Sequence, residues 1–361
     1  MAIPFRRGSK KSIWLSPKLK LIELLTLYDK TVGYTGKKPK KRRPVMTEFI
    51  ITEDFPKNEA EFDKRFSTED ACFEYLFKLR WPSGFICKRC GYEQYWYSAR
   101  RLYICKKCQQ QHSLIAGTIL QNSKKPITSW FKAMWWFTTR KSGVNAINLK
   151  DLLGLGSYET AWSWLQKLRS CTVCQGRDKL TGTVEADEFY IGGQESGGKR
   201  GRAAEHKSAV AIAVEKNGKK LGRIRLQVIA DCSQDRLHDF INNHVQKQSN
   251  IITDSWGGYA GLAGKGYQHD RELQKEAPDK ARVLPGVHLV ISLVKRLILG
   301  TFQGRFHKKH LQGYLDEFVF RFNRRSVAFV GKKFMRIAEQ SMRTDPLPYR
   351  MIIIGAAAQQ M

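Results

Sequence analysis

The chain has 361 residues, of which 42% are hydrophobic, enough for two or three domains with a sizeable core. Its 63 Lys and Arg outnumber its 33 Asp and Glu, which gives a formal net charge of +30. So basic a protein repels itself unless it meets a polyanion. Nucleic acid is therefore the expected partner, and a ribosome-like or anionic-membrane surface is the alternative. The sequence has no run of about 18 uncharged apolar residues and no apolar signal core at its start, so we expect a cytoplasmic protein without a transmembrane helix.

Residues 1–65 are predicted to form a basic, disordered N-terminal extension, because residues 1–45 are rich in Lys and Arg and end in GKKPKKRRPV. Such an arm could lie along DNA phosphates, and KKPKKRRP also resembles a nuclear import signal in composition. Met46 follows the run directly, so the segment could equally lie upstream of the true start. Both interpretations stay open.

Residues 66–120 are predicted to hold a capped helix and a zinc ribbon. The stretch STEDACFEYLFKLR (67–80) begins with Ser67 and Thr68 and continues with an apolar face, the pattern of a capped amphipathic helix. Two Cys-x-x-Cys pairs separated by fourteen residues follow: Cys87 with Cys90, and Cys105 with Cys108. In a chain without an export signal, this spacing favours a metal site over disulfides. Two such pairs can close a tetrahedral, structural Zn²⁺ site, and four unrelated thiols are the alternative.

Three helices are predicted within residues 121–175, over PITSWFKAMWWFTTR, VNAINLKDLLG and SYETAWSWLQKLR. Gly154 and Gly156 separate the last two. A short helical pair with Lys167 and Arg169 on its second helix indicates a helix-turn-helix-like segment that contacts DNA. Helical hairpins of this kind are also common in proteins that never touch DNA.

From residue 181 the sequence changes to strand-forming runs. TVEADEFYIGG, SAVAIAVEK and GRIRLQVIAD predict three strands, and SQDRLHDFINNHV, NIITD and GVHLVISLVKRLILG predict a helix, a strand and a helix. This order of elements predicts a mixed α/β layer, with three strands, a helix, a strand and further helices.

Two aspartates belong to these predicted strands. Asp187 lies in the middle of the first, where an acid is unfavourable unless it is paired or binds metal. Asp254 ends the later strand. Two carboxylates on neighbouring strands can hold a pair of Mg²⁺ ions about 4 Å apart, which is how phosphodiesters are cut and joined. The alternatives are an Arg partner for Asp187 and a turn capped by Asp254.

The order of these motifs resembles that of a bacterial insertion-sequence transposase. A zinc ribbon and a helix-turn-helix come first, then VEADEFYIGG, TDSWGGY, VHLVISLVKRLILGTFQGRF and HLQGYLDEFVFRFNRR. The sequence is similar to the DDE superfamily, in the zinc-ribbon group related to the eukaryotic Merlin transposons, from about Phe66 to Arg325. The resemblance implies an α/β protein with a ribonuclease H-like catalytic core at 181–325, followed by a C-terminal tail at 326–361.

The resemblance also implies a catalytic site. Asp187 and Asp254 match the first and second catalytic aspartates and would bind catalytic Mg²⁺, for which Mn²⁺ can substitute. The group carries Asn and Lys in a Ser-Asn-Leu-Lys stretch of a later helix. Here Lys295 is kept, where it would stabilise charge on the scissile phosphate, but Leu293 stands where Asn is expected.

Leucine cannot bind metal or form a hydrogen bond through its side chain, so Leu293 leaves two interpretations open. His288, Ser292 and Lys295 form a polar stripe at i, i+4 and i+7 on an otherwise apolar helix, and His288 or Ser292 could take the missing role. Otherwise the enzyme is inactive.

The expected function is that of a transposase that binds its element's terminal inverted repeats, cleaves a strand at each end and transfers the freed 3′-hydroxyl to target DNA. It would act on double-stranded DNA as a homo-oligomer. DNA contacts are expected from Lys167, Arg169, Arg296, Arg321, Arg324 and Arg325, and an ordinary charged surface is the alternative for these residues. Two other functions stay open: a catalytically inactive remnant that only binds DNA, and a zinc-ribbon transcription factor or RNA-binding protein.

Overall fold

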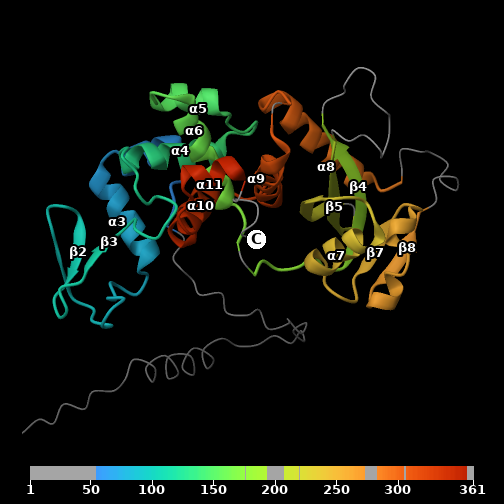
Figure 1. The fold of residues 1–361 in the computed structure, drawn as a ribbon, viewed down its shortest axis with the longest axis horizontal. Helices are drawn as coiled ribbons and strands as arrows, with labels where there is room; N and C mark the ends of the chain where they lie inside the picture. The colour runs from blue at the N-terminus through green and yellow to red at the C-terminus, as the bar shows by residue number, and fades with distance from the viewer. Residues whose placement is uncertain are drawn as a thin grey trace, which may run out of the picture. The chain divides into compact units, whose positions relative to one another are not determined.

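The computed structural model describes residues 54–174, 176–192, 207–218, 220–272, 283–304 and 306–355, which belong to one compact unit (Figure 1). The basic run before Met46, expected as an arm or an upstream extension, lies outside the described residues. The end of that expected extension is helical instead, as α2 (Glu59–Arg65). Asn58 caps this helix by accepting a hydrogen bond from Glu61 N, and Phe62 is buried, so ordered structure begins before residue 66.

A helical part is built around an aromatic core by α3 (Glu69–Arg80), α4 (Ile127–Thr139), α5 (Ala146–Leu153) and α6 (Tyr158–Ser170). These helices confirm the predicted capped helix and the three that follow it. Thr68, Asn145 and Ser157 each accept a backbone N–H of the first turn, which satisfies a donor that the helix itself leaves unpaired. Gly154 ends α5 with a left-handed φ of 59°, which glycine tolerates and which turns the chain towards α6.

The C-terminal segment differs from the expected tail. It contains α10 (Gly331–Arg343) and α11 (Tyr349–Ile354), and α10 packs against α3 and α4. Phe334 of α10 is fully buried, with its ring centroid 5.3 Å from that of Phe62 and 5.6 Å from that of Phe131. The segment therefore completes the helical core, and a five-stranded sheet is inserted between α6 and α10 in the chain.

A small antiparallel sheet carries the second cysteine pair. It consists of β1 (Tyr95–Tyr97), β2 (Leu102–Cys105) and β3 (Gln111–Ser113), in the order β1-β2-β3. The buried ring of Tyr103 lies 5.1 Å from that of Phe77 and 5.2 Å from that of Trp81, so the sheet is docked on the end of α3. This part confirms the predicted zinc-ribbon region.

A five-stranded mixed sheet follows. Its strands are β4 (Thr183–Ile191), β5 (Ser208–Asn217), β6 (Lys220–Ile229), β7 (Asn250–Thr253) and β8 (Gln268–Arg271), in the order β6-β5-β4-β7-β8. The first three strands pair antiparallel, whereas β7 is parallel to both β4 and β8. The arrangement confirms the predicted α/β class with a ribonuclease H-like core. The sequence analysis missed β8, because Gln268–Arg271 is polar throughout.

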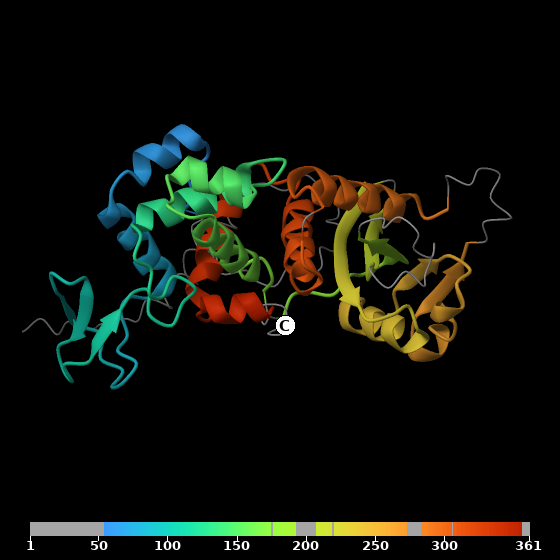
Figure 2. The same cartoon turned by 45° about the horizontal axis from the view of Figure 1, so that its top comes forward.

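Helices cover both faces of this sheet (Figure 2). α7 (Gln234–His244) packs on one face, and α8 (Pro285–Arg296) and α9 (Leu311–Asn323) pack on the other. Short elements between them are η1 (Gly257–Tyr259), η2 (Ala263–Lys265), the π-helical turn η4 (Leu297–Thr301) and η5 (Lys308–His310). Because side chains alternate along a strand, Asp187 shares the face under α8 with Glu185 and Phe189. Within the described ranges, no helix is long and apolar enough to cross a membrane.

Candidate active site and zinc site

The four predicted zinc ligands converge on one point. The sulfur atoms of Cys87, Cys90, Cys105 and Cys108 all lie within 4.8 Å of one another. Cys87 Sγ is 3.6 Å from Cys108 Sγ, and Cys90 Sγ is 3.6 Å from Cys105 Sγ. Each of these contacts therefore joins one sulfur of the first Cys-x-x-Cys pair to one sulfur of the second. Four sulfurs held about 2.3 Å from a tetrahedral ion would be about 3.8 Å apart, so the group fits a structural Zn²⁺ ion.

A histidine that the sequence analysis did not single out lies beside this group. His112 on β3 places its Nε2 3.3 Å from Cys87 Sγ. An imidazole N–H that donates to a thiolate orients a metal ligand without binding the metal itself. The available signal was a His four residues after Cys108.

Asp187 lies on β4, and Asp254 directly follows the end of the neighbouring parallel strand β7. The last pair between the two strands joins Glu185 and Ile252, and each aspartate lies two residues further along its chain. Asp187 therefore lies on the same face of the sheet as Glu185 and Ile252, and both aspartate side chains are half-buried. Asp187 Oδ1 accepts a hydrogen bond from the next backbone N–H at 2.8 Å, and Asp254 Oδ1 accepts one from Trp256 N at 2.9 Å.

Tyr259 and Glu188 adjoin this pair and were not predicted. The hydroxyl of the fully buried Tyr259 donates to Glu188 Oε2 at 3.1 Å. Burial, together with the negative charges of Glu188, Asp187 and Asp254, raises the pKa of Tyr259 well above its ordinary value, so the phenol remains a neutral donor. Side chains alternate along β4, so Glu188 and Tyr259 lie on the α7 face of the sheet, opposite Asp187. The available signal was a tyrosine at the end of TDSWGGY.

A buried glutamate fixes the start of α8 to β4. Glu185 is 1% exposed; its Oε2 accepts a hydrogen bond from Val287 N at 2.9 Å, and its Oε1 lies 2.8 Å from Lys216 Nζ. Gly286 permits this approach, because a Cβ at that position would lie 2.7 Å from Glu185 Oε2. The helix therefore begins directly above the strand that carries Asp187.

The polar stripe and Leu293 occupy different sides of α8. His288, Ser292 and Lys295 are exposed, and a rotation of about 100° per residue places them within about 60° of one another. Leu293 is half-buried against the core shared with α9 and is turned about 140° from His288. A side chain at position 293 therefore does not project with the stripe.

The surroundings of α8 are defined on the Leu293 side of the helix. On the Leu293 side, a Cβ at Gly286 would lie 2.8 Å from Leu221 Cδ2 of β6. On the same side, a Cβ at Gly143 would lie 3.5 Å from Leu297 Cδ1 and 3.6 Å from Glu317 Oε1 of α9. This edge therefore faces β4, β6 and α9, whereas the stripe residues are exposed.

Two residues expected to contact DNA are ion-pair partners of one buried glutamate instead: Arg169 is buried, and Arg321 is half-buried. Arg169 is 2% exposed, and its Nε donates to Glu317 Oε2 at 3.0 Å. Arg321 donates to Glu317 Oε1 at 2.9 Å and to the carbonyl groups of Phe137 and Arg140. Glu317 itself is fully buried. The prediction that Arg169 and Arg321 bind DNA is wrong, because their guanidinium groups neutralise this carboxylate and join α4, α6 and α9.

The other four basic residues lie on separate elements. Arg296 is exposed in the last turn of α8. Arg325 is exposed too, although its guanidinium donates to carbonyl groups at the start of β6. Lys167 of α6 and Arg324 at the end of α9 are half-buried over aromatic rings, at 5.9 Å and 4.3 Å from the ring centroids. Their contacts with DNA stay predictions.

Two family models match the chain. Residues 179–323 match the ISXO2-like transposase domain, and residues 67–111 match the transposase zinc-ribbon domain. No curated protein matches the chain.

Among solved structures, 7 chains match. One belongs to the cryoEM structure of the simian T-cell lymphotropic virus intasome in complex with PP2A regulatory subunit B56 gamma. It is 10% identical, with a TM-score of 0.27, and the match covers 50% of this chain and 66% of that one, slightly less than two thirds of its length.

Proposed function

From the ISXO2-like DDE transposase domain and the transposase zinc ribbon that this chain carries, we propose a DNA transposase that binds the terminal inverted repeats of its own insertion sequence. It cleaves a strand at each end and uses the freed 3′-hydroxyl to attack target DNA. The observation that supports this proposal is the parallel pairing of β4 and β7, with Asp187 on β4 and Asp254 directly after β7.

The acid pair fits a divalent metal site. Carboxylate oxygens are the ligands that Mg²⁺ and Mn²⁺ prefer, and backbone N–H groups orient one oxygen of each aspartate. Glu188 and the neutral Tyr259 add no positive charge, so the site keeps an excess of negative charge that cations would neutralise. When bound, two Mg²⁺ ions would stabilise the attacking and leaving oxygens of the phosphodiester.

We assign the third position of the site to His288. It is exposed in the first turn of α8, directly after Val287, whose N–H is fixed by Glu185. Ser292 is the weaker candidate, because its hydroxyl already donates to Leu289 O at 2.8 Å. An imidazole can bind a transition metal or accept a proton. Two carboxylates and an imidazole should favour Mn²⁺ over Mg²⁺, since imidazole suits transition metals better.

Lys295 continues the stripe two turns further, about 10 Å along the helix axis from His288. At that distance its ammonium group would contact a phosphate next to the scissile one, or charge that develops on it. The zinc ribbon offers a second DNA surface. Trp96 and Tyr97 are 58% and 52% exposed on β1, and the exposed cations Lys106 and Lys107 lie between two of the cysteines. Because two element ends must be joined, the active form would be a homo-oligomer on double-stranded DNA.

The test is cleavage of labelled DNA that carries the ends of the element, with Mg²⁺ or Mn²⁺. Asp187→Asn and Asp254→Asn should each reduce cleavage on the order of a thousandfold or more and leave end binding intact. Asp239→Asn, the same change at an exposed position of α7, is the control. Cleavage retained by Asp187→Asn would overturn the assignment.

A second set of variants addresses the third position. His288→Ala should abolish cleavage, whereas Leu293→Asn should leave cleavage unchanged, because that side chain packs on the side of α9. The catalytically inactive remnant makes the opposite prediction: the natural protein would bind the ends without cutting, and Leu293→Asn would restore cutting.

A further inference from the structure

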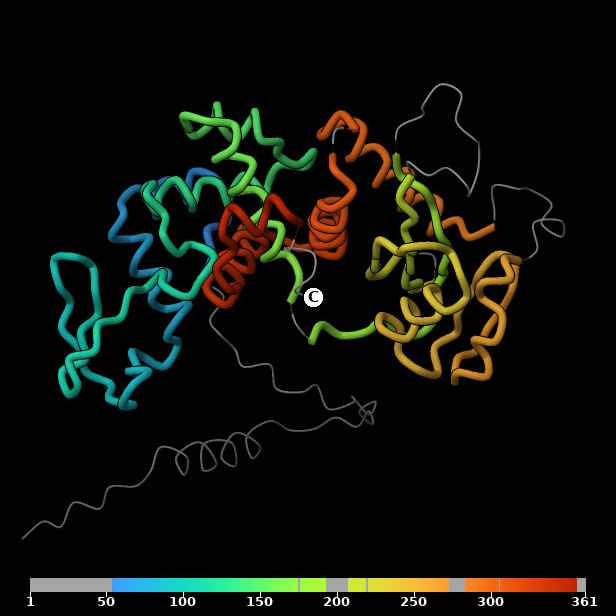
Figure 3. The backbone as a smooth tube through the Cα atoms, viewed as in Figure 1, coloured from blue at the N-terminus to red at the C-terminus, as the bar shows by residue number. Residues whose placement is uncertain are grey.

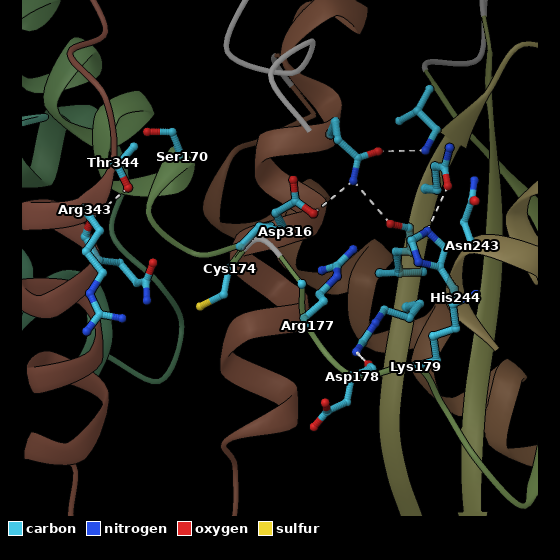
Figure 4. A pocket seen from close by; sticks show the side chains of 18 of the residues that line it. Ser170, Cys174, Arg177, Asp178, Lys179, Asn243, His244, Asp316, Arg343 and Thr344 are labelled. Atoms are coloured by element: carbon cyan, nitrogen blue, oxygen red, sulfur yellow. Dashed lines mark hydrogen bonds between the residues drawn. The ribbon is translucent and has the colours of Figure 1, made fainter. Parts of the chain in front are cut away.

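A basic cavity of about 1380 Å³ lies away from the acid pair (Figure 4). It is lined by the connection from α6 to β4, which Figure 3 traces, and by β6 and the end of α7. Residues of α9 and the end of α10 line it as well. Since β6 is separated from β4 by β5, the cavity is distinct from the site of Asp187 and Asp254.

Cations gather around one histidine in this cavity. Burial and the charges of Arg177, Arg225 and Lys179 lower the pKa of His244 to about 3, so the imidazole is neutral at neutral pH. Burial and the charges of Arg177 and Arg223 likewise lower the pKa of Arg225 to about 10, against the opposing charges of Glu215 and Asp178. Cations that oppose one another's ionisation in a buried setting are unfavourable unless an anion compensates them.

The hydrogen bonds leave donors available for such an anion. Arg225 uses its terminal nitrogens on the carbonyl groups of Ile224, at 3.0 Å, and Asp178, at 2.5 Å. Within the described ranges, no carboxylate forms an ion pair with Arg177 or Arg225. Arg177 extends into the cavity between Asp316 and His244 (Figure 4). Its guanidinium therefore presents unused N–H groups to the space.

A buried acid faces Arg177 across the cavity. Asp316 of α9 is 1% exposed; its Oδ1 accepts from Gln312 Nε2 at 3.0 Å, and its Oδ2 has no partner among the described residues. Burial raises the pKa of Asp316 to about 7, against the opposing effects of Gln312 and Arg177. Near neutral pH a large share of this carboxyl is therefore neutral, and a neutral carboxyl can donate an O–H to an anion instead of repelling it.

We propose that this cavity binds a phosphate group, with Arg177 and Arg225 as its charged ligands and Lys179 at its exposed rim. The phosphate belongs to the backbone of a DNA molecule that lies along the edge strand β6. Only the choice of DNA as the source of the phosphate rests on the proposed function. A free phosphate ion has the same chemistry and is the competing source.

The first experiment uses inorganic phosphate and the full-length protein. Thermal unfolding is measured at constant ionic strength while phosphate replaces chloride. The natural protein should show a saturable rise in Tm of about 2–4 °C, and Arg177→Gln should lose that rise. Lys220→Gln, which removes an exposed charge at the start of β6 outside the cavity, should keep it. Because the phosphate-dependent shift is compared and not Tm itself, a modest loss of stability in Arg177→Gln does not affect the test.

The second experiment measures binding of a random-sequence DNA duplex at several salt concentrations. Arg177→Gln should weaken binding about three- to tenfold at low salt and reduce the slope of log Kd against log salt by about 1. A phosphate response with unchanged DNA binding would overturn DNA as the source. Absence of both effects would overturn the phosphate site. A protein that shows both effects but never cleaves its ends keeps the site and contradicts only the proposed transposase activity.

Discussion

The zinc ribbon and the five-stranded sheet each bring ligand side chains together, but by different routes. In the ribbon, Cys87 and Cys108 are 21 positions apart and meet through two tight turns and a hairpin. In the sheet, the proposed site of Asp187 and Asp254 depends on the parallel pairing of β4 and β7, which are far apart in the sequence. The first site needs a short stretch of chain and an ion, and the second needs the whole sheet. The two sites should therefore be lost independently.

The largest expected effect is removal of zinc. Structural Zn²⁺ contributes about 10 kcal/mol or more to small cysteine sites, so a chelator or Cys105→Ser should unfold the ribbon. Hydrogen exchange should show lost protection over 87–113 and unchanged protection over the sheet strands at 208–229. Cys171→Ser, a buried cysteine outside the four-sulfur group, should retain the metal as measured by atomic absorption. Loss of protection in both regions would show that they fold as one unit.

The next effect concerns Glu317, where the helical part and the sheet-covering helix α9 meet. Glu317→Gln leaves Arg169 and Arg321 buried without their counter-charge and should lower the free energy of unfolding by about 3–5 kcal/mol. Glu339→Gln is the control, since its partners are exposed arginines of the same helix, and it should cost about 0–1 kcal/mol. Urea unfolding followed by tryptophan fluorescence measures both. Equal effects of the two variants would contradict a buried junction.

A smaller effect, confined to the sheet, depends on pH. Although burial opposes it, hydrogen bonds from Arg223 and Thr181 lower the pKa of Glu215 to about 2, against about 4.3 in an unfolded chain. A lowered pKa stabilises the fold above the unfolded value, and this stabilisation decreases as the pH falls from about 4.3 to about 2. Glu215→Gln should therefore be less stable than the natural protein by about 1–2 kcal/mol at pH 7, and by roughly half of that at pH 3.

Urea titrations at several pH values test this, and Glu74→Gln, which removes an exposed helix pair with Lys78, should show no such pH dependence. A difference for Glu215→Gln that stays constant between pH 7 and pH 3 would contradict the assignment of the shift to Glu215.

The smallest effect is expected at Tyr259. Tyr259→Phe removes the hydrogen bond to Glu188 and should raise the Mn²⁺ concentration needed for half-maximal cleavage about tenfold, without changing DNA binding. Tyr267→Phe removes a comparable hydrogen bond, to Asn242 Oδ1, and should leave the metal requirement unchanged. A parallel loss in both variants would indicate a general loss of stability and not a role at the acid pair.

The same contrast explains what the sequence could predict. The cysteine spacing specified the zinc ligands, because tight turns leave few alternatives. Strand patterns located both aspartates, but only the structure shows that β4 and β7 pair in parallel. Charge is visible in a sequence whereas burial is not, so Arg169 and Arg321 were taken for surface residues. The phosphate cavity draws on five separate segments, and no local pattern marks such a site.

The insertion of the sheet between α6 and α10 has a consequence for synthesis. The ribosome releases α2 to α6 first, yet Phe334 and its neighbours, which close their aromatic core, emerge only after the entire five-stranded sheet. Until then, one side of the apolar core of the N-terminal helices stays exposed to solvent. Chaperones bind exposed apolar surface at this stage. A protein truncated before residue 331 would lack α10 and α11, and therefore the side chains of α10 that close this core.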